Sequence, residues 1–203
     1  RRSMKQDLTL GIRFIFSRPV ILGALSLDLF AVLFGGVVAL LPVFAHDILH
    51  VGESGLGLLR AAMSIGSVSM MAFLSWKPIG KHAGRYMLWS VAGFGVCMLA
   101  FSASTVFALS VAILIIAGSF DAVSVVVRHT ILQLETPEDM KGRVAAANTM
   151  FISSSNELGA VESGIAAKLF GTVPSVVLGG MMTLLVVGIV AWKNPKLRRM
   201  DMR

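Results

Sequence analysis

Ionisable side chains stand inside long apolar stretches of this sequence, where each costs at least about 2.5 kcal/mol at the centre of a bilayer unless it is paired or hydrated. Asp121 and Arg128 lie in one such stretch, with Ser124 between them. On a helix the two charges fall about 20° apart on one face and about 10.5 Å apart along the axis. They could therefore bracket a polar site that binds a solute or transfers protons.

A second group of polar residues lies within residues 144–168. At helical spacing Asn148, Ser155 and Glu162 fall close to one line, whereas Glu157 points the opposite way. An edge of small and polar residues is typical of a helix that lines a cavity or packs closely against a neighbour. Two earlier apolar stretches contribute one candidate charge each. The candidates for a substrate or proton pathway are Asp28, Arg60, Asp121, Ser124, Arg128, Asn148, Ser155, Asn156, Glu157 and Glu162.

A structural interpretation of the same charges is that they form satisfied ion pairs, which fix the register of neighbouring helices. It requires Asp121 to pair with Arg128, and Arg60 to pair with some carboxylate. Ionisable groups inside a membrane are functional by default, although pairs also build helix bundles. For the set taken together, a polar pathway is the favoured interpretation.

A metal site is conceivable at His46 and His50, whose H-x-x-x-H spacing places two imidazoles on one helical face. Neither the Glu of an H-E-x-x-H motif nor a sheltered third ligand accompanies them, so a solvated loop end is favoured. The sequence has no nucleophile elbow, Walker loop or Gly-rich dinucleotide turn. We therefore expect neither an enzyme nor an ATP-driven pump, and we expect no metal and no cofactor.

The composition indicates the surroundings in which these residues are held. Hydrophobic residues make up 56% of the 203 residues and charged residues 14%, with a mean hydropathy of +0.81. A soluble domain carries roughly 25% charged residues. Lipid must therefore surround most of the protein. The net charge of +7 does not predict nucleic acid as a partner, because the charges fall between apolar stretches rather than on one face.

Six apolar stretches are each long enough to cross a hydrocarbon core of roughly 30 Å as a helix. They cover residues 19–45, 54–76, 86–104, 105–133, 144–168 and 173–192. Glycines inside them, Gly66 and Gly118 among others, predict close helix contacts. Most of the 18 Lys and Arg flank these stretches on a single side. The positive-inside rule then predicts a multi-pass protein of the cytoplasmic (inner) membrane with both termini in the cytoplasm.

Residues 144–168 form the least apolar of the six stretches. The alternative for them is a cytoplasmic surface helix, which would leave five crossings and put the C-terminal basic residues outside, against the same rule. We therefore keep six crossings. The expected organisation is a cytoplasmic linker with an amphipathic helix in residues 1–18, a six-helix transmembrane bundle in residues 19–192 and a cytoplasmic basic tail in residues 193–203.

Several stretches resemble the second half of exporters of the major facilitator superfamily. LGIRFIFSRPVILG resembles their central linker and seventh helix, GLLRAAMSIGS the eighth helix, and GKHAGRYML the loop that follows it. FDAVSVVVRHTILQLETPEDMKGRVAAANTMFISSSNELGAVESG resembles the tenth and eleventh helices of the enterobactin-exporter branch, also described as transmembrane secretion effectors. The resemblance extends over nearly the whole chain.

The resemblance implies an all-α membrane protein with six transmembrane helices, half of a twelve-helix fold. It further implies proton-driven export of a siderophore, drug or similar metabolite by alternating access, with the lipid bilayer and an N-terminal six-helix half as partners. The candidates for cytoplasmic gating are Gly80, Gly84, Arg85, Lys141, Gly142 and Arg143. The G-x-x-x-G-R loop at Gly80 lacks the Asp of the superfamily's usual signature, which weakens the expectation of a gating salt bridge there.

Two other functional interpretations stay open. Because the sequence begins at Arg1 without an initiator Met, it is expected to be a piece of a longer protein. The chain could then be a truncated membrane remnant that transports nothing and acts at most as an interaction module. An intramembrane hydrolase is disfavoured, because no pair of nucleophile and base is visible in the sequence.

Overall fold

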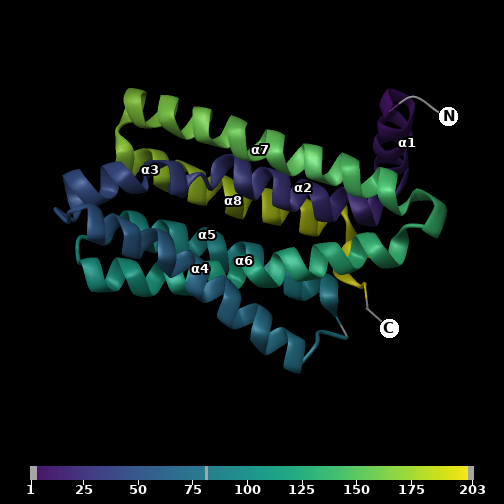
Figure 1. The fold of residues 1–203 in the computed structure, drawn as a ribbon, viewed down its shortest axis with the longest axis horizontal. Coiled ribbons are helices and arrows are strands. Elements are labelled where there is room, and N and C mark those ends of the chain that lie inside the picture. The colour runs from purple at the N-terminus through teal and green to yellow at the C-terminus, as the bar shows by residue number, and fades with distance from the viewer. Residues whose placement is uncertain (1–3, 81, 201–203) are drawn as a thin grey trace.

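The computed structural model describes residues 4–80 and 82–200, and these residues form helices and connecting turns without a strand. Figure 1 shows the long helices lying side by side. Their bounds are α1 Met4–Ser17, α2 Pro19–Phe34, α3 Val37–Val43, α4 Glu53–Trp76, α5 Ala83–Ser102, α6 Phe107–Glu135, α7 Lys141–Phe170, α8 Thr172–Lys193 and α9 Pro195–Arg198. A π-helical turn, Phe44–Ile48, continues α3, and a 3₁₀ turn, Glu138–Met140, precedes α7.

The predicted all-α membrane fold is confirmed. Each apolar stretch of the sequence is helical over most of its length, although the first is divided between α2 and α3. Five segments of the described chain are long and apolar enough to cross a membrane: Pro19–Ile48, α4, α5, α6 and α8. With its 30 residues α7 is as long as any of them, but its polar side chains keep it out of this group. Length and composition therefore support five crossings, and the sixth depends on where α7 lies.

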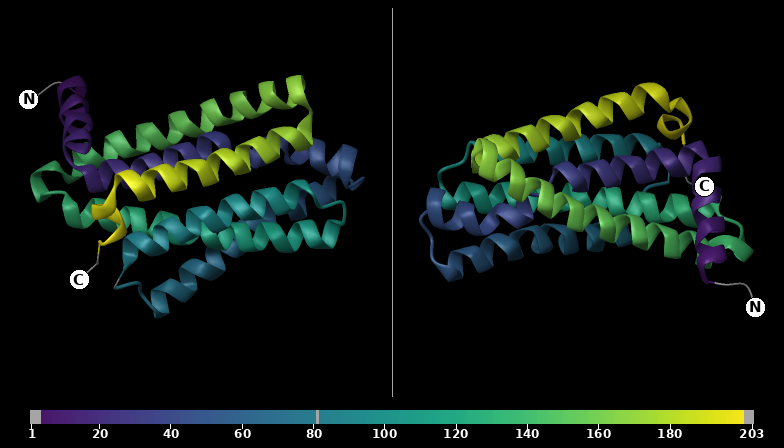
Figure 2. Two further views of the ribbon diagram at one scale, coloured as in Figure 1. Left: turned by 180° about the vertical axis from the view of Figure 1, so that it is seen from behind. Right: turned by 90° about the horizontal axis from the view of Figure 1, so that it is seen from above.

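The helices form two layers, which Figures 1 and 2 show from three directions. The front layer of Figure 1 contains α7, α2 with α3, α6 and α4, whereas α8 and α5 lie behind it. In the back layer α5 packs against both α6 and α8, and α8 also contacts α2 and α7. The position of α7 beside α2 is that of a member of the bundle. It packs against the apolar helices α2 and α8, as a helix of the bundle does, and not apart from them as a surface helix would.

The first membrane segment is broken near its middle. It begins at Pro19, where a proline is tolerated because the first N–H of a helix has no partner within that helix. The helix α2 ends at Phe34, where the N–H of Gly35 donates to the carbonyl of Ala31 at 2.7 Å, and α3 resumes at Val37. Irregular backbone at membrane depth is tolerated where it is buried in protein or lines a cavity. The break therefore directs attention to the space beside Gly35.

Two Gly-Ser pairs hold α4 and α6 together, as the glycines predicted. Ser67 donates to the carbonyl of Gly118 at 2.9 Å, and Ser119 donates to the carbonyl of Gly66 at 3.2 Å. A Cβ atom added to Gly66 would overlap the backbone carbonyl of Ile115, and the same atom on Gly118 would overlap the backbone of α4. We call this reciprocal contact the Gly-Ser clasp. Small residues of this kind let two membrane helices approach until their backbones touch.

The end of the bundle where α2 begins is crossed by α1, which stands roughly perpendicular to the other helices (Figures 1 and 2). Arg143 of α7 donates through Nε to Asp7 of α1 at 2.7 Å, and Ile15 of α1 is buried. At the other terminus Asn194 accepts from the N–H of Leu197 and donates to the carbonyl of Pro19. Both ends of the described chain are therefore tied to the bundle. Residues 1–3 and 201–203, which belong to the predicted linker and basic tail, lie outside the described residues.

Candidate functional site

A cavity of about 410 Å³ lies at the break in the first membrane segment. Its walls come from α2, α3, α4, α5, α6 and α7. They are formed by Asp28, Ala31, Val32, Gly35, Gly36, Val38, Ala39, Met63, Ser90, Val91, Phe94, Phe120, Asp121, Ser124, Asn156 and Ala160. Val38, Asn156 and Ala160 are exposed, so the cavity opens at the front layer. The size is that of a site for a small organic molecule, and the walls are mainly apolar.

Four of the ten residues predicted for a substrate or proton pathway line this cavity. They are Asp28, Asp121, Ser124 and Asn156. They come from three helices, so the fold brings together polar groups that are up to 128 residues apart in the sequence. A fifth candidate, Arg128, lies next to the cavity because it contacts Asp28.

The partner of Arg128 is Asp28 of α2, so the pairing of Arg128 with Asp121 that the structural interpretation required is wrong. The guanidinium Nη1 forms an ion pair with Oδ2 of Asp28. Arg128 is 3% exposed and Asp28 6%, so the pair is withdrawn from solvent. The Nε atom of Arg128 has no hydrogen-bond partner in the described chain. Sequence spacing within one helix could not reveal this contact, because it joins two helices 100 residues apart.

The two other candidates on α6, Asp121 and Ser124, have no partner among the described residues. Asp121 is half-buried and makes no hydrogen bond or ion pair with any residue that the structure describes. One helical turn further on, the hydroxyl of Ser124 is buried and has no partner within the described chain. A carboxylate and a hydroxyl in this condition are free to bind a ligand. Because both line the cavity, the ligand would bind at this wall.

Two aromatic walls, Phe94 of α5 and Phe120 of α6, were missed by sequence reasoning. Phenylalanines are frequent in this chain, and the sequence carries no signal that separates a phenylalanine that lines a cavity from one that faces lipid. The position of Phe120 next to Asp121 is the one clue available, because successive helical residues share an adjoining part of the surface. Phe94 has no such clue.

The predicted stripe on α7 divides among several environments. Ser155 donates to the carbonyl of Leu29 at 2.7 Å and so holds α7 against α2. Asn148 is buried in a second pocket, of about 500 Å³, between α6 and α7, where its Oδ1 has no hydrogen-bond partner among the described residues. Glu162 is half-buried and receives a long hydrogen bond, 3.4 Å, from Ser163. Glu157 is exposed.

The exposed front of α7 is itself polar. Thr149, Ser153, Asn156 and Glu157 are exposed on one side of this helix. Arg60 of α4 is also exposed and forms no hydrogen bond or ion pair among the described residues, so the predicted contact with a carboxylate is not found there. A polar helix face within a membrane must be covered by protein or by water. This polar side of α7 is therefore poorly suited to contact with lipid, whereas Leu158, Val161 and Ile165 are exposed on the adjoining side of the same helix.

The gating candidates fall in the loop before α5 and in the first turns of α5 and α7. Gly80 is in the turn between α4 and α5, Gly84 and Arg85 are in the first turn of α5, and Lys141, Gly142 and Arg143 are in the first turn of α7. Lys141 forms an ion pair of 2.6 Å with Glu138, and Arg143 forms one of 2.7 Å with Asp7. Gly84 packs against the backbone of Leu197 in α9. Lys141 and Arg143 are therefore both paired with carboxylates of this same chain.

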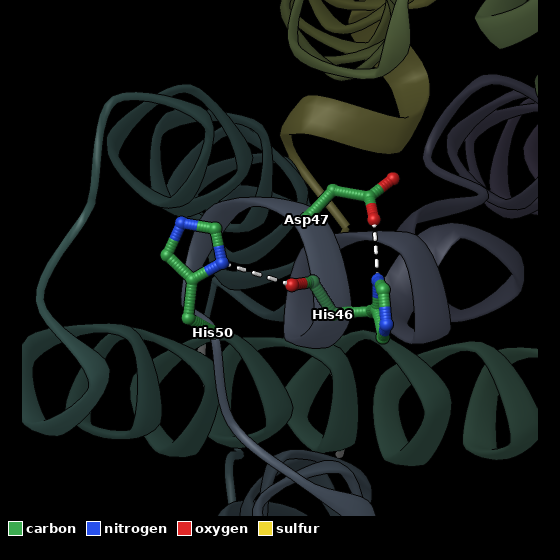
Figure 3. A network of polar contacts seen from close by, with 3 residues as sticks. All are labelled: His46, Asp47 and His50. Carbon is green, nitrogen blue, oxygen red and sulfur yellow. Dashed lines mark hydrogen bonds and ion pairs between the residues drawn. The ribbon is translucent and has the colours of Figure 1, made fainter.

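His46 and His50, which lie at the π-helical turn after α3, do not converge on a common point (Figure 3). Nδ1 of His46 lies 2.6 Å from Asp47, whereas Nδ1 of His50 lies 3.1 Å from the backbone carbonyl of His46. All three residues are exposed. Within residues 4–80 and 82–200 no group of three His, Cys, Asp or Glu residues could hold a metal ion.

Comparison with known proteins gives a consistent set of relatives. A family model described as Major Facilitator Superfamily matches residues 1–160. The chain is 28% identical over 185 residues to the enterobactin exporter EntS of Citrobacter koseri, covering 91% of this chain and 44% of that protein. The enterobactin exporters EntS of Shigella flexneri and Escherichia coli O1:K1 are also 28% identical over 186 residues, covering 91% of this chain and 43% and 44% of those proteins. The chain thus spans less than half the length of these relatives. No solved structure matches it at a significant level.

Proposed function

Because the chain belongs to the Major Facilitator Superfamily, we propose that it forms the C-terminal six-helix half of a proton-driven exporter of a small molecule. The family and the names of the relatives indicate a transporter rather than an enzyme. The observation that carries the proposal is the 410 Å³ cavity, which opens at the front layer and contains an unpaired Asp121. A cavity at a broken helix, lined by a few polar groups, is where transporters of this architecture bind their substrates.

In this proposal α7 is the sixth crossing, and a second six-helix half covers the front layer. The polar front of α7, with Ser153 and Glu157 exposed, supports this arrangement because lipid alone would leave those groups unsatisfied. The substrate then binds between the halves, and rocking of one half against the other exposes the cavity to each side of the membrane in turn. The Asp121 carboxylate is the group proposed to exchange protons during this cycle.

The proposal is tested by efflux of fluorescent small molecules, 2-(1-naphthyl)ethylamine among them, from vesicles that contain the full transporter, with and without an imposed proton gradient. We expect transport that follows the gradient, and we expect Asp121→Asn to lower the gradient-driven rate by at least about tenfold, since proton transfer by a positioned group contributes about 10²–10⁴-fold in proton-transfer chemistry. Asp47→Asn, which changes an exposed carboxylate in the π-helical turn after α3, is the matched control and should leave the rate unchanged.

Two outcomes of this assay would contradict the proposal. Transport that does not respond to the proton gradient would refute antiport. If the 203-residue chain alone transported as fast as the full transporter, no second half would be needed. If both the chain alone and the full protein inserted into the membrane but transported nothing, the interpretation as an interaction module would be supported.

The proposed orientation, with both termini in the cytoplasm, predicts the labelling of single cysteines. In a Cys97→Ala background, Asp47→Cys should react with a membrane-impermeant maleimide in intact cells. In the proposed orientation the exposed π-helical turn that contains Asp47 faces the exterior. Glu138→Cys, which is exposed between α6 and α7, should react only after the membrane is permeabilised. Modification is read as a mass shift of the protein. Labelling of Glu138→Cys in intact cells would mean that the assigned orientation is inverted.

A further inference from the structure

We propose that the cavity is selective for lipophilic amines in their protonated form, held through Asp121 and Ser124. This inference rests on the proposed function, because it names the chemical class that the same cavity would export. It follows from the charges, the aromatic walls and the unpartnered polar atoms that line the cavity.

The charge of the cavity wall is negative. Asp28 is neutralised by its ion pair with Arg128, so this pair adds no net charge. No Lys, Arg or His is among the described residues that line the cavity. Asp121 is therefore its one uncompensated charge within the described chain. An anionic ligand would be repelled by this carboxylate, whereas a cation would be attracted to it in surroundings where water does little screening.

The remainder of the cavity suits an apolar body attached to that cation. Phe94 and Phe120 contribute aromatic surface, and Val91 and Met63 contribute aliphatic surface. Aromatic rings also attract cations through the negative potential of their faces, by about 0.5–2 kcal/mol. An amine that carries an aromatic or branched hydrocarbon group meets both requirements.

The hydroxyl of Ser124 distinguishes between kinds of cation. This residue is 3% exposed, it lines the cavity and its oxygen has no hydrogen-bond partner in the described chain. It lies three residues after Asp121 in α6, on the same face of the helix. An ammonium group with N–H bonds can donate to both oxygens, whereas a quaternary ammonium has no N–H to donate. Donation to both oxygens needs at least two N–H bonds, so the ligand class is a primary or secondary amine.

The test uses four probes with the same ring: 2-(1-naphthyl)ethylamine, its N-acetyl amide, its N,N,N-trimethyl form and 3-(1-naphthyl)propanoate. Binding to purified protein in zwitterionic nanodiscs is measured by equilibrium dialysis, with empty nanodiscs as the blank. We expect the amine to bind at least about tenfold more tightly than the amide or the carboxylate, since an unpaired buried charge is costly. Equal or tighter binding of the carboxylate would overturn the proposal.

The variants assign the effect to the two residues. Asp121→Asn should weaken binding of the amine and of its trimethyl form by at least about tenfold, whereas Asp47→Asn should change neither affinity. Ser124→Ala should weaken the amine by about tenfold and leave the trimethyl form unchanged, because only the amine donates a hydrogen bond. Loss of both affinities in Ser124→Ala, or of neither in Asp121→Asn, would contradict the proposed contacts.

This design separates the inference from the proposed function. If the amine binds as expected but is not exported by the full transporter, the transport proposal fails and the ligand class stands. If export is observed while Asp121→Asn leaves amine binding intact, the ligand class is wrong and the transport proposal stands.

Discussion

Replacement of Asp28 by Asn is expected to lower the free energy of unfolding of the bundle by about 3–5 kcal/mol. The substitution keeps the size of the side chain but removes the charge that faces Arg128 across the contact between α2 and α6. The guanidinium is 3% exposed, so water cannot replace the lost partner. A buried ion pair broken from one side leaves an uncompensated charge, and this is more costly than the absence of both charges. Unfolding in mixed micelles with increasing SDS measures the difference.

The matched control for this prediction is the double variant Asp28→Leu with Arg128→Met. It removes both charges and replaces them with apolar side chains, so we expect it to recover most of the stability that Asp28→Asn loses. A single Asp28→Asn variant within about 1 kcal/mol of the wild type would show that Arg128 finds another partner or reaches water, and the prediction would then be wrong.

The second large effect is expected at the Gly-Ser clasp. Gly66→Ala should lower the free energy of unfolding by about 1–3 kcal/mol, because the added methyl group overlaps the backbone carbonyl of Ile115 and forces α4 away from α6. The separation would also lengthen the hydrogen bonds of Ser67 and Ser119, which depend on the same close approach. The same SDS titration measures this change.

Gly57→Ala, on the same helix α4, is the control for the clasp. No atom lies within 4 Å of a Cβ added at Gly57, so the substitution meets no steric resistance. Alanine is a better helix former than glycine by about 0.8–1 kcal/mol, so this variant should be as stable as the wild type or more so. If Gly66→Ala and Gly57→Ala behaved alike, the close contact between α4 and α6 would not contribute to stability.

The helices could be predicted from the sequence because lipid imposes a simple pattern on it. A long apolar stretch between polar loops has few alternatives to a membrane helix, and glycines such as Gly66 and Gly118 indicated where helices approach closely. The same reasoning is weakest at α7. There the hydroxyl of Ser155 donates to the backbone of α2, and Asn148 lies between α6 and α7. The position of α7 is therefore decided by tertiary contacts, because its composition alone does not indicate whether it crosses the membrane.

The site could be predicted only in part, because spacing along one helix says nothing about the helix opposite. Asp121 and Ser124 were correctly placed on one face of α6, and both line the cavity. The ion pair of Arg128 with Asp28 was not predictable, since it depends on which helices become neighbours after folding. The aromatic walls were missed for the same reason.

The Gly-Ser clasp has a mechanical consequence for the cavity. Two serine hydrogen bonds and direct backbone contact join α4 to α6, so we expect these two helices to move as one rigid unit. Any tilt of α4 is transmitted to α6, which carries Asp121, and from there to α2 through the buried ion pair. The first membrane segment yields most easily at Gly35 and Gly36, where its helix is already interrupted. We therefore expect a movement of α4 to change the shape of the cavity at the wall that contains Asp121.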